Sequence, residues 1–230
     1  MIISFAFATW IMTLFDVSTP AFSEDLATTF RNLDAAANAL PENISTQRLD
    51  ELNDLAQWVA KRPMDQETSL VFICTHNSRR SHMGQIWGQA AAWAYGLDDV
   101  RTYSGGTEAT QFNPRAIRAL RELGVNISEN AGRHQVKLQA SRPAFEVFSK
   151  VYSDEVNPSG DFAAIMTCND ADEACPIVYG AAVRFALPYA DPKASDGSLE
   201  EASTYQARAM EIGAEIFYVM KRAAELRRAY

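Results

Sequence analysis

Residues 70–73, Leu-Val-Phe-Ile, form a short and continuous apolar run, followed at once by a polar loop and then by a helical pattern. A strand that is apolar on both faces must be covered on both faces, which is typical of a parallel sheet between helices. Further strands are predicted at 100–104, 162–167 and 183–187, and further helices at 114–123 and about 199–228. We therefore predict an α/β fold with a four-stranded parallel sheet flanked by helices.

Residues 23–62 precede this alternation and predict two amphipathic helices. Leu26, Phe30 and Leu33 recur at helical spacing in the first helix, the Pro-Glu-Asn sequence at 41–43 interrupts the pattern, and a second helix follows. Proline ends helices, so the second helix should stop before residue 63. The two helices are expected to form an N-terminal helical hairpin that packs on the main domain or on a partner.

The chain is accordingly divided into an N-terminal extension, residues 1–65, and a main domain, residues 66–230. Residues 133–156 do not fit the alternation of strands and helices, and their apolar positions predict a small inserted strand pair. The sequence assigns no function to the extension or to the insertion.

The first residues allow two interpretations. Residues 1–15 are almost wholly apolar, and Ala21-Phe22-Ser23 resembles a small-residue cleavage site. No Lys or Arg precedes the apolar run, which is shorter than the about 20 residues that cross a bilayer. Residues 1–23 are either a signal peptide or the product of a misassigned start, with translation beginning at Met12. No membrane partner is expected.

Charge and cysteine content narrow the classes of function. A net charge of −8 argues against non-specific nucleic-acid binding, but a local group of N–H donors and arginine can still bind a small anion. The three cysteines, Cys74, Cys168 and Cys175, are too few for a typical secreted disulfide framework. We expect free thiols in a reducing cytoplasm.

The segment between the first predicted strand and its helix carries the chemistry. Backbone N–H groups of a tight loop at a helix N-terminus bind oxyanions and favour the thiolate of Cys74. Arg80 can hold two oxygens with its planar fork, Ser81 can donate a hydrogen bond to the sulfur, and Asn77 tolerates left-handed backbone geometry. We predict that Cys74 is a nucleophile against a tetrahedral oxyanion, phosphate or arsenate. The expected binding loop is Cys74-Thr75-His76-Asn77-Ser78-Arg79-Arg80-Ser81.

With Tyr103-Ser104-Gly105-Gly106-Thr107-Glu108 and residues 113–117 downstream, this loop resembles the low-molecular-weight protein tyrosine phosphatases. It is still more similar to the thioredoxin-coupled arsenate reductases built on that fold. The similarity runs from about residue 70 to residue 224. It implies that Asp191, which precedes a proline after the last strand, is the general acid that protonates the leaving oxygen.

Residues 167–176 resemble the redox segment of these reductases, with seven residues from Cys168 to Cys175. The resemblance implies a thiol relay: Cys74 attacks arsenate, Cys168 attacks the sulfur of Cys74 and releases arsenite, and Cys175 then attacks Cys168. External thioredoxin would reduce the final disulfide, and no bound cofactor is implied. Because all three cysteines fall on relay positions, the reductase is preferred.

Two other functions stay open. A phosphatase needs only Cys74, Arg80, Asp191 and water, and a non-catalytic oxyanion-binding module could use the helical hairpin as its interaction surface. Two loop residues differ from the family pattern. His76 stands where the family usually has glycine, and Arg79 stands where it often has cysteine. Arg79 adds a second guanidinium to the loop, beside that of Arg80. Asn77 and Ser104 match two positions of a potassium site found in the family. Residues 128–132 lack the Thr-x-Asp sequence that many relatives use to hold this ion.

Overall fold

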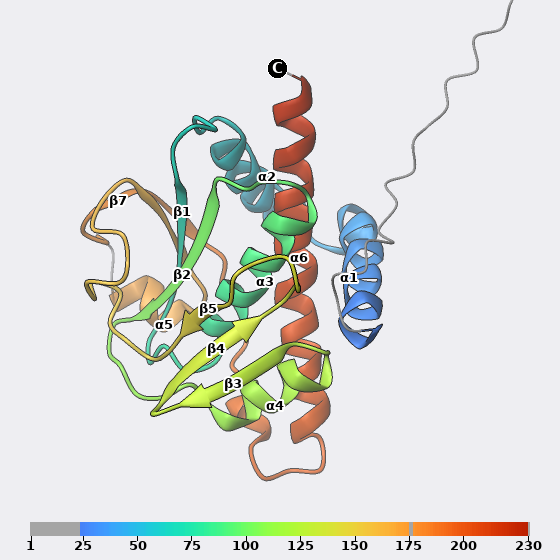
Figure 1. The fold of residues 1–230 in the computed structure, drawn as a ribbon, viewed down its shortest axis with the longest axis vertical. Coiled ribbons are helices and arrows are strands. Elements are labelled where there is room, and N and C mark those ends of the chain that lie inside the picture. Colours follow the sequence, from blue (N-terminus) through green and yellow to red (C-terminus); the bar gives the residue numbers. More distant parts are fainter. Residues whose placement is uncertain (1–23, 175–176, 230) are drawn as a thin grey trace, which may run out of the picture.

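Four parallel strands form the larger of two sheets in the described part of the chain (Figure 1). The computed structural model describes residues 24–174 and 177–229, so the alternatives for residues 1–23 and the position of Cys175 lie outside the described residues. The strands lie in the order β2-β1-β6-β7, and every neighbouring pair is parallel, which confirms the predicted sheet. They are β1 (Thr68–Cys74), β2 (Val100–Gly106), β6 (Phe162–Met166) and β7 (Ala181–Ala186).

Helices cover both faces of the sheet. Leu70 and Phe72 of β1 belong to the main core, whereas Val71 and Ile73 belong to a smaller cluster on the other face with α5. This alternation follows from the period of two in a strand, and it explains why every residue of β1 is buried. The helices of the main domain are α3 (Arg80–Ala94), α4 (Pro114–Glu122), α5 (Asn169–Ala174) and α6 (Glu201–Ala229), with a 3₁₀ turn η1 (Pro192–Ser195).

The carboxyl ends of parallel strands meet at one edge of the sheet. Here β1 ends at Cys74, β6 ends two residues before Cys168, and β7 ends five residues before Asp191. The fold therefore brings three residues that are far apart in the sequence to the same edge.

The N-terminal extension forms α1 (Glu24–Asn43) and α2 (Thr46–Ala60), and both helices pack against α6 (Figure 1). Leu33 lies over Gly213 of α6, where a β-carbon would come within 2.7 Å of a Leu33 methyl group. The expectation that residues 41–43 interrupt the first helix is wrong, because α1 includes Pro41. Pro41 lies in the last turn, where a missing N–H costs one hydrogen bond and the helix ends two residues later.

Residues 133–156 contain the predicted strand pair, and a third strand just before them completes an antiparallel sheet in the order β3-β4-β5. Its strands are β3 (Asn126–Asn130), β4 (Arg133–Lys137) and β5 (Phe145–Val147). In β3 only Ile127 is buried, so its sequence has no apolar alternation. The turn between β3 and β4 contains Ala131 and Gly132, both with positive φ (52° and 77°), as a tight hairpin requires.

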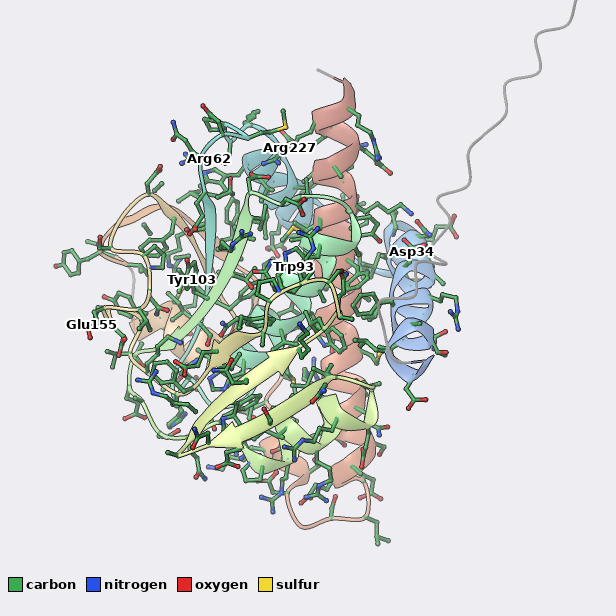
Figure 2. All side chains as sticks on the ribbon, in the orientation of Figure 1. Asp34, Arg62, Trp93, Tyr103, Glu155 and Arg227 are labelled. Carbon is green, nitrogen blue, oxygen red and sulfur yellow. The ribbon has the colours of Figure 1, made fainter. Side chains whose placement is uncertain are left out.

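The C-terminal end of α6 joins the extension to the sheet. Arg227 lies near the C-terminal end of α6 (Figure 2). It donates to the Val59 carbonyl of α2 at 3.0 Å and to both carboxylate oxygens of Asp99, just before β2, at 2.6 and 2.8 Å. Among the described helices, none is long and apolar enough to cross a membrane.

Truncation of Leu33 should destabilise the whole protein, because its side chain is fully buried between α1 and α6. We expect Leu33→Ala to lower the free energy of unfolding by about 2–5 kcal/mol, measured by urea denaturation. Leu199→Ala is the control, since Leu199 is 99% exposed and its truncation should change that energy by less than about 0.5 kcal/mol. Equal effects of the two substitutions would contradict the packing of α1 on α6.

Candidate functional site

The loop after β1 turns tightly between Cys74 and the start of α3 at Arg80. Cys74 is 3% exposed, and Asn77 has a φ of +43°, the left-handed geometry expected for this position. The backbone N–H groups of Thr107 and Glu108 donate to the carbonyls of Cys74 and Thr75, at 3.2 and 2.9 Å. The loop carbonyls are thus held by the chain that follows β2.

Gly106, the last residue of β2, allows this close approach. A β-carbon at Gly106 would lie 2.7 Å from the Asn77 nitrogen and 2.7 Å from the Thr75 carbonyl oxygen. These distances are below ordinary van der Waals contact, so a side chain at this position would push the loop away from β2.

A chain of hydrogen bonds fixes the hydroxyl of Ser81 toward the sulfur. The backbone N–H of Lys150 can only donate, so the atom of Asn77 that it meets at 2.9 Å must be the amide oxygen. The amide nitrogen of Asn77 then donates to the Ser81 hydroxyl oxygen at 2.8 Å. The Ser81 proton is left to point at the sulfur of Cys74, 3.1 Å away. This arrangement stabilises a thiolate at Cys74.

Arg80 joins this loop to the segment after β7. Its two terminal nitrogens donate to the Tyr189 carbonyl and to the Asp191 carboxylate, both at 2.8 Å. Asp191 also caps the 3₁₀ turn by accepting from the Lys193 N–H at 3.0 Å. Arg80, in the loop that begins at Cys74, therefore ties this loop to Asp191, and the catalytic roles of the three residues stay predictions.

Arg79 points toward α6. Its Nε donates to the Tyr205 hydroxyl at 2.9 Å, and that hydroxyl donates to Asp196 at 2.7 Å. Burial, together with the bond to Asp196, raises the pKa of Tyr205 to about 12, so the hydroxyl keeps its proton at neutral pH. Arg79 also lies 4.0 Å from Asp191, which places the second guanidinium of the loop beside the predicted general acid.

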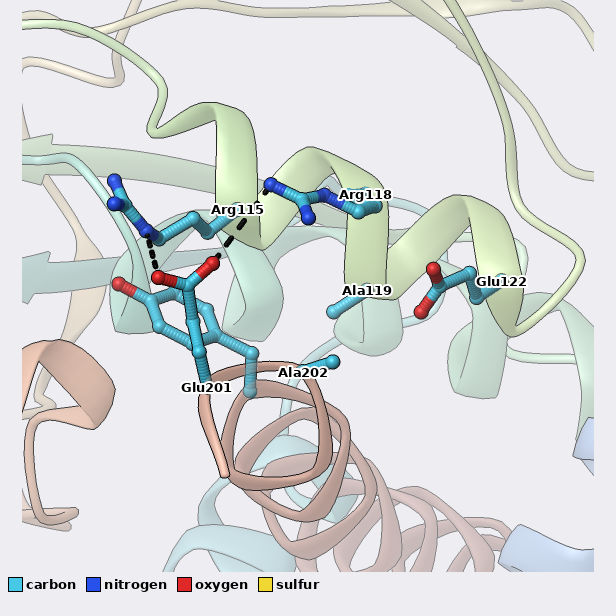
Figure 3. Close-up of a pocket in the computed structure, with 7 residues that line it drawn as sticks. Arg115, Arg118, Ala119, Glu122, Glu201 and Ala202 are labelled. Carbon is cyan, nitrogen blue, oxygen red and sulfur yellow. Dashed lines mark hydrogen bonds and ion pairs between the residues drawn. The ribbon is translucent and has the colours of Figure 1, made fainter. Parts of the chain in front are cut away.

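A second contact holds the end of the segment that carries Asp191. Glu201, the first residue of α6, accepts from Arg115 at 2.7 Å and from the Gly197 N–H at 2.8 Å, and Arg118 lies 3.8 Å away (Figure 3). Arg115, Arg118 and Glu201 also line a small pocket between α4 and α6. The segment from Asp191 to Glu201 is thus fastened at both ends.

The other loop residues lie around this centre. His76 is about half exposed and pairs with Glu108 at 2.9 Å, while its carbonyl accepts from the hydroxyls of Thr110 and Ser149. Ser78 is buried, and its carbonyl accepts from the Asn113 N–H at 2.9 Å.

Cys168 lies beside the loop. Its sulfur is 3.5 Å from the hydroxyl of Thr75, the residue next to Cys74, and its side chain is buried. Thr167 fixes this position, because its N–H and its hydroxyl both donate to the Ile73 carbonyl, at 2.7 and 2.9 Å. Cys74 and Cys168 both carry free thiols. The third predicted relay residue, Cys175, lies outside the described part of the chain.

Lys150 is a site residue that sequence reasoning missed. Besides its bond to Asn77, its carbonyl accepts from the Gly106 N–H at 2.9 Å, so the segment after β5 closes on the loop. Its ammonium group lies in a buried environment, and burial lowers the pKa of Lys150 to about 8. A single lysine in an irregular segment carries no sequence signal for such a contact.

The two residues proposed to lie near a potassium ion have protein partners. The amide oxygen of Asn77 accepts from the Lys150 N–H, and its amide nitrogen donates to Ser81. The Ser104 hydroxyl donates to Gln85 at 2.7 Å. The potassium site therefore stays a prediction.

Comparison with known proteins finds relatives for the main domain. Residues 69–143 match the family model described as low molecular weight phosphotyrosine protein phosphatase. Arsenate reductase 2 of Staphylococcus epidermidis is 34% identical over 115 residues, which cover 50% of this chain and 70% of the relative. An arsenate reductase of Bacillus licheniformis is 30% identical over 158 residues, 68% of this chain and 95% of the relative. A solved low-molecular-weight protein tyrosine phosphatase from T. tengcongensis aligns with 67% of this chain and 99% of its own at 17% identity and a TM-score of 0.47.

Asn77→Asp should slow alkylation of Cys74 without disturbing the loop backbone. Aspartate tolerates the left-handed geometry and still accepts from Lys150, but it cannot donate to Ser81, whose proton then turns away from the sulfur. Hydrogen bonds to charged groups contribute about 1.5–3 kcal/mol, so the rate with iodoacetamide at pH 7 should fall about 10-fold or more.

Ser81→Ala should also slow the alkylation of Cys74, because it removes the hydroxyl that donates to the sulfur. Thr110→Val is the matched control, since the Thr110 hydroxyl binds the His76 carbonyl of the same loop but not the sulfur. The hydrogen-bond chain would be wrong if Asn77→Asp alkylated as fast as the control.

Acid should destabilise the protein through His82, which is buried in α3 against Phe112. Burial and the charge of Lys150 lower the pKa of His82 to about 3, from an ordinary value of 6.5. Between these values the unfolded chain binds a proton that the folded chain excludes, so this stability is complete above pH 6.5 and is lost as pH falls.

The loss approaches about 1.4 kcal/mol per pH unit, and it can be measured by urea unfolding at pH 7.5 and pH 5. His82→Leu, which cannot titrate, should show a shallower dependence. Identical slopes for the two proteins would refute a neutral buried imidazole.

Proposed function

Since the chain belongs to the low-molecular-weight phosphotyrosine protein phosphatase family, on the branch of the arsenate reductases, we propose that it reduces arsenate to arsenite with Cys74 as the nucleophile. It is an enzyme of the arsenate reductase and low-molecular-weight phosphatase kind. The observation that carries the proposal is the second buried thiol beside the anion loop, Cys168, whose sulfur lies 3.5 Å from the Thr75 hydroxyl. A phosphatase has no use for that thiol.

The first step is attack on the bound oxyanion. The loop N–H groups and Arg80 bind arsenate, and the sulfur of Cys74 forms a bond to arsenic(V) as one As–O bond breaks. Asp191 gives its proton to the departing oxygen, which leaves as water. Ser81 stabilises the thiolate before the attack through its 3.1 Å contact with the sulfur.

The second step transfers two electrons. The thiolate of Cys168 attacks the sulfur of Cys74, an S–S bond forms, and the electron pair of the S–As bond passes to arsenic, which leaves as arsenite. Cys175 then attacks the sulfur of Cys168 and frees the thiolate of Cys74. Two thiols have been oxidised to one disulfide, and arsenic(V) has been reduced to arsenic(III).

We expect α5 to unwind in the last exchange, on the basis of the sequence spacing of the two cysteines. Cys168 and Cys175 are seven residues apart, with the six residues of α5 between them. Two helical turns span roughly 10 Å, whereas a disulfide needs α-carbons within about 7 Å. The helix is short and contains two aspartates and an asparagine, which are poor helix formers, so its unwinding costs little.

We infer that an external dithiol protein of the thioredoxin type reduces the Cys168–Cys175 disulfide, in a reducing cytoplasm and without a bound cofactor. The exposed side chains of Ile177 and Tyr179, 67% and 79% exposed, support this proposal. They follow Cys175 closely in the sequence and offer an apolar surface on which such a partner could dock.

Serine substitutions test the relay. Cys74→Ser, Cys168→Ser and Cys175→Ser should each lower thioredoxin-dependent arsenate reduction more than about 10³-fold, because each removes a sulfur that forms a bond. The rate is followed as oxidation of NADPH through thioredoxin and its reductase. Full turnover by Cys168→Ser and Cys175→Ser would exclude the relay.

A phosphatase is the second candidate, because Cys74, Arg80 and Asp191 together suffice for hydrolysis through a phosphocysteine. An aryl phosphate distinguishes the two functions. Fast hydrolysis that depends on Cys74 and Asp191 and is indifferent to Cys168→Ser would favour the phosphatase.

A further inference from the structure

We infer that Arg48, in the N-terminal extension, is a positioning residue for the oxyanion site: it sets the places of Arg80 and Asp191 through a buried ion pair with Glu215 and the side chain of Tyr189. The inference rests on the proposed function, since it takes the loop at Cys74 to be the anion site. It also gives the extension a role in that site.

Arg48 leaves the first turn of α2 and reaches into the protein toward α6. Its Nε and one terminal nitrogen donate to the two carboxylate oxygens of Glu215, at 3.0 and 2.8 Å. This is the bidentate geometry in which a guanidinium holds a carboxylate most firmly. The two side chains are only 15% and 6% exposed, so the pair is shielded from water.

Tyr189 is bound by both members of this pair. Its hydroxyl donates to Glu215 at 2.7 Å, and the Arg48 guanidinium lies over its ring, 4.9 Å from the ring centre. Arg48 also donates to the carbonyl of the preceding residue, Pro188, at 3.4 Å. Burial and the neighbouring charge of Glu215 raise the pKa of Tyr189 well above its ordinary value, so the hydroxyl remains a donor.

Tyr189 transmits this position to the anion site. Its carbonyl accepts from one terminal nitrogen of Arg80 at 2.8 Å, and Asp191, two residues later, accepts from the other at 2.8 Å. The Nε of Arg80 has no hydrogen-bond partner in the described part of the chain, so donors remain for an oxyanion that enters the loop. Because the Tyr189 carbonyl anchors one terminal nitrogen, the guanidinium is held in the site while it binds the anion.

This network comes from parts of the chain that are distant in sequence. Arg48 belongs to α2, Glu215 to α6, Tyr189 to the segment after β7 and Arg80 to α3. Arg48 lies outside residues 69–143, the part that matches the family model. The extension therefore contacts Pro188 and Tyr189, which adjoin the anion site, from outside the region that matches the family model.

The test measures anion binding separately from nucleophilicity. Inorganic phosphate should protect Cys74 from iodoacetamide, and the phosphate concentration that halves the alkylation rate reports binding at Arg80. The alkylation rate without phosphate reports the reactivity of the Cys74 sulfur. Ser81 and Asn77 contact and orient this part of the site without involving Arg48. Alkylation is read by mass spectrometry of the tryptic peptide that contains Cys74.

The main variant is the double substitution Arg48→Met with Glu215→Leu. Removal of one partner would leave a buried charge unpaired, whereas replacement of both by apolar side chains is often tolerated. Tyr189→Phe is a milder second variant that removes only the hydroxyl bond to Glu215. The control is Asn53→Ala, which removes the 2.9 Å bond from the Tyr218 hydroxyl between the same two helices, α2 and α6.

We expect the half-protecting phosphate concentration to rise about 10-fold in the double variant and about threefold in Tyr189→Phe, with no change in Asn53→Ala or in the alkylation rate without phosphate. If a folded double variant had the same half-protecting phosphate concentration as the wild type, the inference would be overturned. It would also be overturned if Asn53→Ala raised that concentration as much as the double variant does. If the double variant does not fold, wild-type protection in Tyr189→Phe overturns it instead.

The proposed function can fail separately. If phosphate protection weakens in the Arg48 double variant but the wild-type protein does not reduce arsenate, the inference stands and the reductase is excluded. A wild-type protein in which phosphate gives no protection would overturn both.

Discussion

Arg80 is the side chain on which the site depends. One terminal nitrogen holds the carbonyl of Tyr189 and the other holds the carboxylate of Asp191, so a single guanidinium ties the loop after β1 to the segment after β7. Only a planar fork with several donors can make both contacts and still present an edge to an oxyanion. The parallel sheet makes this geometry available, because it ends β1 and β7 at the same edge.

Two segments outside the strand–helix alternation then brace the loop from different sides. The segment after β5 binds Asn77 through the Lys150 N–H, and this contact orients Ser81 toward the sulfur of Cys74. Arg48 of the N-terminal extension is connected to Arg80 through Glu215 and Tyr189. The first contact acts on Cys74, the proposed nucleophile, and the second acts on Arg80, the proposed anion-binding residue, so the two parts of the site are supported by different segments.

Local chemistry explains which features could be predicted from the sequence. The sheet followed from the apolar runs, the interest in Cys74 and Arg80 from the chemistry of a loop between a strand and a helix, and Asp191 only from the resemblance to a known family. The third inserted strand was missed because only Ile127 of β3 is buried, so the strand carries no alternation. The contacts of Lys150 and Arg48 were missed for a different reason, because each joins residues that are far apart in the sequence. Lys150 follows Asn77 by 73 positions, and Glu215 follows Arg48 by 167 positions. No local pattern encodes such pairs.

The fate of the thiol–arsenate adduct decides between reduction and hydrolysis, and a single-turnover experiment observes it directly. The reduced protein is treated with one equivalent of arsenate in the absence of thioredoxin, digested without reductant and analysed by mass spectrometry. The relay predicts one equivalent of arsenite, a free thiol at Cys74, and a peptide containing Cys168 and Cys175 that is lighter by about 2 Da, the mass of two hydrogens lost to a disulfide. Three free thiols with no arsenite released would contradict the relay.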